Sequence, residues 1–149
     1  MHAGFYVTLI GAALLSVIFY KLNQRRTASI QALATRLGAS PAGNTLPSSL
    51  DLRETGLASI TRASNVIAVD RRGIRVIAFD CQIGRGRGSW YRTVMAAQTS
   101  DDIFGMFNPE FTVEHSGGWI ILYQAKGVSA VSSGLMSADE IEARLNALA

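Results

Sequence analysis

The run from Gly84 to Gly88 (GRGRG) alternates glycine with arginine, a composition that can bind phosphate. A glycine-rich turn exposes backbone N–H groups, and Arg85 and Arg87 would add bidentate donors. The run lacks the Gly-Lys-Ser/Thr ending of a Walker loop, and a strand rather than a helix is expected to follow it. A hairpin turn with solvated arginines is the simpler interpretation. In the functional one, headgroup or other phosphate contact uses Gly84, Arg85, Gly86, Arg87, Gly88 and neighbouring Trp90.

Asp80 is an acid inside a strongly apolar run, Ala78 to Cys81. A buried carboxylate needs a partner, and we expect Arg92 or Arg62 to supply it. If Asp80 were unpaired in a cleft, its pKa would rise and it could act as a general base. A small enzyme with Asp80 as its acid/base is therefore the alternative to a structural ion pair.

The chain has one cysteine, Cys81, and two histidines, His2 and His115. A single cysteine excludes a disulfide framework and makes no cysteine-rich metal site. A nucleophilic Cys81 would need His115, which lies more than thirty residues further along the chain. We expect a buried structural cysteine, no metal site and no cofactor.

An uncharged apolar run, Gly4 to Tyr20, precedes all of these residues. With Ala3 it would form about 27 Å of helix, close to the thickness of a bilayer's hydrocarbon core. Tyrosines stand near both ends, where interfacial aromatics belong. We predict a transmembrane anchor over residues 1–22. Its marker residues and basic flank are Gly4, Tyr6, Leu14, Phe19, Tyr20, Lys21, Arg25 and Arg26.

The positive charge follows the apolar run, whereas a cleavable signal peptide has it before the run. The positive-inside rule then places the N-terminus outside and the rest of the chain in the cytoplasm, as a single-pass protein of a bacterial inner membrane. Twelve of the 14 Lys and Arg residues, but four of the 11 acids, lie between Lys21 and Arg92. Anionic lipid headgroups are therefore the nearest plausible partner, and nucleic acid is not expected.

Residues 23–49 read as a juxtamembrane helix and linker. Helical spacing of Ile30, Leu33 and Leu37 predicts a helix over 27–37, which could continue the anchor, and Gly38 would end it. The next segment, 39–49, is rich in Ser, Pro, Gly and Asn and is typical of a linker. Residues 50–149 remain for one globular domain.

Within that domain, β-branched and aromatic runs alternate with glycine-bearing turns, which predicts strands over 63–70, 74–83, 89–99, 109–115 and 119–124. Both faces of 74–83 are apolar, as expected of a central strand. A short helix is expected near 100–107. An amphipathic helix closes the chain, with Ser137 and Glu140 as its capping box. The predicted fold class is α+β: a transmembrane helix, an antiparallel sheet of about five strands, and a C-terminal helix.

Three short motifs stand out along these strands: 65–67 (NVI), 73–76 (GIRV) and Phe79-Asp80, followed by the glycine-rich turn. Together they resemble small bacterial membrane-anchored proteins of unknown function, in which a turn glycine precedes a strand ending in Phe-Asp-Tyr. Here Cys81 stands in place of that tyrosine. The resemblance covers roughly 33–99 and the strand at Trp119. It implies a helix-anchored antiparallel sheet and brings no activity.

We therefore expect a non-enzymatic binding or scaffold module at the cytoplasmic membrane face, in contact with anionic headgroups or another membrane protein. The rival is a small membrane-tethered enzyme that uses Asp80. A third interpretation is an accessory subunit of a membrane complex that docks through its helix. The close placement of Gly11, Ala12 and Ala13 would permit helix packing, although there is no full GxxxG motif.

Overall fold

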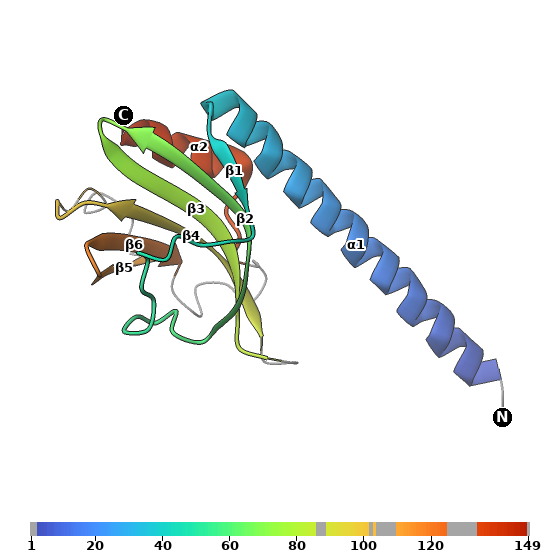
Figure 1. The fold of residues 1–149 in the computed structure, drawn as a ribbon. Coiled ribbons are helices and arrows are strands. Elements are labelled where there is room, and N and C mark those ends of the chain that lie inside the picture. Colours follow the sequence, from blue (N-terminus) through green and yellow to red (C-terminus); the bar gives the residue numbers. More distant parts are fainter. Residues whose placement is uncertain (1–2, 86–88, 102, 104–109, 125–133, 149) are drawn as a thin grey trace.

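The computed structural model describes residues 3–85, 89–101, 103, 110–124 and 134–148, which form two helices flanking an antiparallel sheet (Figure 1). In chain order the elements are α1 (Ala3–Leu37), β1 (Ser40–Gly43), β2 (Ile60–Arg71), β3 (Ile74–Ile83), β4 (Trp90–Gln98), β5 (Phe111–Ser116), β6 (Trp119–Gln124) and α2 (Ala138–Ala147). The predicted α+β class is confirmed. The described part has one strand more than expected, because β1 forms inside the segment predicted to be a linker.

The sheet has the strand order β1-β2-β3-β4-β6-β5, and all neighbours are antiparallel. β2 and β3 are joined by a two-residue turn in which Arg72 and Gly73 have φ of 50° and 79°. Positive φ at both central residues gives a turn whose twist matches that of the strands, which explains the glycine there. β3 lies between β2 and β4, as its two apolar faces predict.

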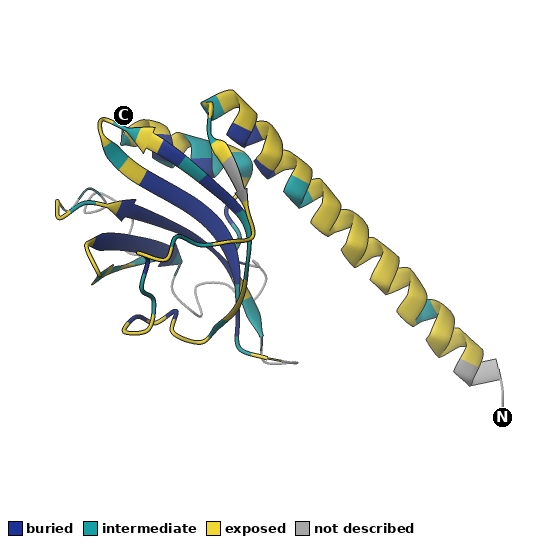
Figure 2. Ribbon diagram, viewed as in Figure 1, coloured by how far each residue is buried: buried dark blue, intermediate teal, exposed yellow. Residues whose placement is uncertain are grey.

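Two apolar cores lie on opposite faces of the sheet, and the central strands β3, β4 and β6 are mostly buried (Figure 2). The helix-side core packs Val76 and Ala78 of β3 against α2 and the C-terminal part of α1. The loop-side core packs Ile77 and Phe79 against Trp119 and against leucines of the 44–59 segment: Leu46, Leu50, Leu52 and Leu57. The helical cover is thus on one face, and an irregular segment covers the other.

α1 is one unbroken helix whose C-terminal part packs on the sheet and whose N-terminal part is exposed. Side chains 6–25 are exposed except at half-buried Gly11, and this stretch projects away from the sheet (Figure 2). Ile30, Leu33 and Ala34 are buried in the helix-side core. The helix is long and apolar enough to cross a membrane. The globular packing therefore begins well before Leu50, where the sequence predicts the domain to start.

Polar contacts fix both helices at their ends. Arg36 of α1 forms ion pairs with Glu142 and Asp139 of α2. At the start of α2 the Ser137 side chain accepts a hydrogen bond from the Glu140 backbone N–H at 3.1 Å, which is one half of the predicted capping box. The Glu140 carboxylate accepts from Arg144. The expected helix near 100–107 lies largely outside the described residues.

Candidate functional site

The Asp80 carboxylate on β3 is the centre of the most connected polar cluster among the described residues. It is 6% exposed and accepts four hydrogen bonds. Arg26 Nε (3.0 Å) and Asn65 Nδ2 (2.8 Å) donate to Oδ2, whereas Arg26 Nη2 (2.9 Å) and Thr93 Oγ1 (2.7 Å) donate to Oδ1. We call Arg26, Asn65, Asp80 and Thr93 the Asp80 cluster.

Local backbone features place two members of this cluster. Thr93 lies directly opposite Asp80 in the β3–β4 register. Asn65 lies at a register shift of β2 and has φ of 53°, a left-handed conformation that asparagine tolerates better than most residues. A bulge re-aims a side chain, and here it turns the Asn65 amide toward the carboxylate.

The cluster joins three parts of the chain that are far apart in sequence. Arg26 comes from α1, 54 residues before Asp80, and its Nη1 also donates to the carbonyl of Met136, just before α2. The Thr93 hydroxyl donates its one proton to Asp80 and accepts from the Met136 backbone N–H at 2.9 Å. The cluster therefore holds α1 and the segment leading into α2 against the sheet.

This geometry suits a structural ion pair better than a general base. A bidentate arginine–carboxylate pair is among the stronger and most directional polar contacts in proteins. The gap beside Asp80, lined by Ile30, Ile67 and Ile141 among others, is too small to admit a water molecule. A general base must reach the proton it removes, directly or through one water, and Asp80 meets only its own partners.

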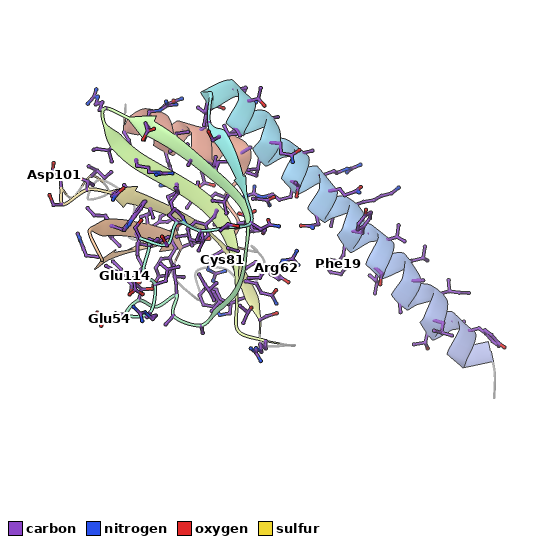
Figure 3. The ribbon with its side chains drawn as sticks, in the orientation of Figure 1. Phe19, Glu54, Arg62, Cys81, Asp101 and Glu114 are labelled. Carbon is purple, nitrogen blue, oxygen red and sulfur yellow. The ribbon has the colours of Figure 1, made fainter. Side chains whose placement is uncertain are left out.

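The expectation that Arg92 or Arg62 pairs with Asp80 is wrong. Arg92 is buried, but it donates from Nε to the carbonyl of Gln124 at 3.0 Å, and its guanidinium stacks over the Trp90 ring at 4.3 Å. Arg62 is exposed on the side of the sheet that faces α1 (Figure 3). The partner is Arg26, which the sequence analysis assigns to the basic flank of the anchor.

Arg92 is also held by a close approach of the chain before α2. Gly134 has φ of 66°, and a Cβ at that position would lie 2.1 Å from Arg92 Nη1. The Gly134 carbonyl accepts the Thr93 backbone N–H at 3.0 Å. The ring of Trp90, a predicted binding residue, is covered by the Arg92 guanidinium.

The glycine–arginine run is described only at its first two residues. The Gly84 backbone N–H donates to the carbonyl of Ser59 at 3.2 Å, so this amide is not available to a phosphate. Arg85 is exposed. The predicted site residues Gly86, Arg87 and Gly88 lie outside the described residues.

Cys81 is buried in the loop-side core. Burial, and secondly the charge of Asp80, raise the pKa of the thiol to about 12, so at neutral pH it is protonated and a poor nucleophile. His115 lies on β5, and two strands separate β5 from β3, which places the two backbones roughly 14 Å apart. No group of three metal-ligating side chains comes together in the described part of the chain.

A second polar contact, which the sequence analysis does not anticipate, ties the 44–59 segment to the sheet. Glu114 of β5 accepts from the Tyr123 hydroxyl at 3.0 Å and from the Gly56 backbone N–H at 3.0 and 3.1 Å. Burial raises the pKa of Tyr123, so it remains a hydrogen-bond donor. A Cβ at Gly56 would lie 2.3 Å from the Tyr123 hydroxyl, which explains the glycine.

Apart from Arg26, the residues assigned to the anchor make no contact with the core that the structure describes. Tyr6, Leu14, Phe19 and Tyr20 are exposed, as are Lys21 and Arg25, and Gly4 lies in the first turns of α1.

Figure 1 shows that β3 ends and β4 begins at the end of the sheet that lies toward the N-terminus of α1. We call this the β3–β4 end (residues 60–62, 82–85 and 89–91).

Of the cluster members, only Asp80 and Arg26 are singled out by sequence, and for separate reasons. The signals for the others are weak: an asparagine inside a strand run, which permits a left-handed bulge, and a threonine in register with Asp80. The chain matches no protein-family model and shows no significant similarity to a curated protein or to a solved structure.

Proposed function

We propose that the chain is a membrane-anchored, non-enzymatic binding module whose domain rests on anionic lipid headgroups through the β3–β4 end. The observation that supports this most is the position of Arg26, which belongs both to the anchor helix and to the Asp80 cluster. Arg26 lies six residues after Tyr20, a rise of about 9 Å along the helix. The headgroup layer on each side of a bilayer is of similar thickness, about 5–8 Å. A domain attached at that depth must touch the headgroups.

The direction in which the helix leaves the domain also supports this contact. α1 is held by Arg26, by the buried face of Ile30 and Leu33, and by the ion pairs of Arg36, so it cannot swivel freely. The apolar part of α1 runs toward the side where the β3–β4 end lies (Figure 1). That end carries exposed Arg62 and Arg85, and each cation near an anionic surface contributes about 1 kcal/mol of attraction.

The proposed location is a bacterial inner membrane, with the N-terminus outside and the domain in the cytoplasm. Orientation is chosen during insertion, before Arg26 is paired, so Lys21, Arg25 and Arg26 all count as cytoplasmic charges. A membrane-impermeant maleimide is expected to label Ser100→Cys in inverted vesicles and to leave it unlabelled in intact cells. Labelling in intact cells would indicate the opposite orientation.

Headgroup contact can be measured with a label at each end of β4. We expect a fluorophore on Ser89→Cys, in nanodiscs with anionic lipid, to be quenched by lipids that carry a spin label on the headgroup. The same fluorophore on Ser100→Cys should not be quenched, because β4 spans about 30 Å between the two positions. Buried Cys81 should stay unlabelled in the parent protein, so the fluorescence comes only from the label on the introduced cysteine.

Charge-matched variants test whether arginines make this contact. Arg62→Gln, Arg85→Gln and Arg87→Gln together should reduce quenching at Ser89→Cys, and raised salt should do the same. The control removes the same charge at the opposite end, through Arg71→Gln, Arg72→Gln and Arg75→Gln. Equal quenching at both labels, or none in anionic nanodiscs, would contradict the proposal and leave a protein partner as the better explanation of this end.

A further inference from the structure

A cavity of about 350 Å³ opens where the β2–β3 turn meets the C-terminal end of α2. Its walls combine Arg71 and Arg72 with the apolar side chains of Ile74, Val76, Ile103 and Leu148. The volume lies within the range of small-molecule sites, which are mostly apolar with a few placed polar groups. Figure 1 shows the β2–β3 turn at the opposite end of the sheet from the β3–β4 end. The cavity beside this turn therefore belongs to a different surface from the proposed headgroup contact.

The sheet positions Arg71, whose Nε lacks a hydrogen-bond partner among the described residues. It is the last residue of β2 and lies opposite Ile74 in the register, so both side chains share the face that α2 covers. Its Nε is buried and has no hydrogen-bond partner among the residues that the structure describes. Leaving a buried donor unpaired is costly, more so in a charged group, which favours an acceptor at this position.

The described residues around the cavity carry positive charge only. The described residues that line it include two arginines and no acid. Arg72, which is exposed and has φ of 50° in the tight turn, also lines this cavity. Two cations beside an apolar wall are complementary to an anion that carries an apolar body.

We propose that this cavity binds a small amphipathic anion, with a carboxylate or phosphate group at Arg71 and Arg72 and an apolar body against Ile74, Val76 and Leu148. The guanidinium fork matches either acidic group through paired hydrogen bonds, and Arg71 Nε would gain its missing acceptor. The apolar wall selects against fully hydrated anions, because burying it from water requires an apolar portion of the ligand.

The test uses the full-length protein in nanodiscs of zwitterionic lipid, with phenyl phosphate as the probe and ligand-observed NMR as the measurement. We expect phenyl phosphate to bind at millimolar or lower concentration, and inorganic phosphate and benzyl alcohol to bind much more weakly. Arg71→Gln should weaken binding about tenfold, as loss of a charge-assisted pair implies. Leu148→Trp, which fills the cavity and keeps both charges, should weaken it as well.

Arg75→Gln is the matched control. Arg75 is an exposed arginine of the same hairpin, and alternation along β3 points it to the opposite face from Ile74 and Val76. It should bind phenyl phosphate like the parent protein. Equal weakening by Arg71→Gln and Arg75→Gln would overturn the proposal, because it would mean a non-specific charge effect. Absence of binding, or equal affinity for inorganic phosphate, would overturn it too.

Discussion

Replacing Asp80 with alanine is expected to lower the free energy of unfolding of the domain by about 3–5 kcal/mol, because it leaves Arg26 in its half-buried place without a counter-charge. Arg26→Ala should cost a similar amount, since it strands a carboxylate that is 6% exposed. Urea titration of the full-length protein in detergent micelles, followed by fluorescence of buried Trp119, measures both variants.

Two comparisons show whether the pair itself carries this effect. The double variant Arg26→Ala with Asp80→Ala should be less destabilised than the sum of the single variants, by about 1–3 kcal/mol. Asp70→Ala is the control, because Asp70 is exposed at the end of β2 and its loss should change stability by no more than about 0.5 kcal/mol. If Asp80→Ala lowered the free energy of unfolding no more than Asp70→Ala does, Asp80 would not be structural, and an acid/base role would be favoured again.

Leu33→Ala is expected to destabilise the domain by about 2–5 kcal/mol, although Leu33 belongs to the same helix as the predicted membrane anchor. Its side chain is 0% exposed and packs in the helix-side core, so truncation leaves a cavity that neighbours from the sheet cannot fill easily. The same urea titration reports the change.

Leu15→Ala is the matched control for this prediction. Leu15 lies in the same helix, but its side chain is 57% exposed and touches no core. In micelles its truncation should leave the unfolding of the domain unchanged within about 0.5 kcal/mol. Equal effects of the two variants would mean that α1 does not pack on the sheet in solution.

These two predictions bear on how the domain can be isolated. A fragment that starts at Thr27 lacks Arg26 and so strands the Asp80 carboxylate. A fragment that starts at Leu50 also loses Leu33 and Ala34 from the helix-side core, together with the edge strand β1. Measurements of lipid or ligand binding are therefore best made on the full chain.

Many arginines of the basic half lie in one of three environments, whereas Arg36 and Arg53 form surface ion pairs. Arg26 and Arg92 are drawn into the fold, where their donors satisfy a carboxylate and backbone carbonyls. Those at the β3–β4 end face the proposed membrane contact. Those at the β2–β3 turn border the cavity. The net charge of +3 is thus the sum of surfaces with different partners, and only the exposed ones can attract a ligand.

The sequence by itself determined the features that depend on neighbouring residues. The apolar run predicts a long helix, the turn at Arg72 and Gly73 predicts the first hairpin, and the capping box of Ser137 predicts the start of α2. In each case the physical cause lies within a few residues: hydropathy, positive φ or an unpaired backbone N–H. The central position of β3 also followed, because both of its faces are apolar.

Only the tertiary structure decided which arginine pairs with Asp80 and where along α1 the packing against the sheet begins. Twelve basic residues between Lys21 and Arg92 made the pairing ambiguous, and both expected partners, Arg92 and Arg62, were wrong. The docking of α1 depends on a sheet formed by residues 40–124. The helical spacing of Leu33 indicates an apolar stripe, but no local pattern shows which surface that stripe packs against. An ion pair across 54 residues is set by how the elements pack, and packing is a property of the whole chain.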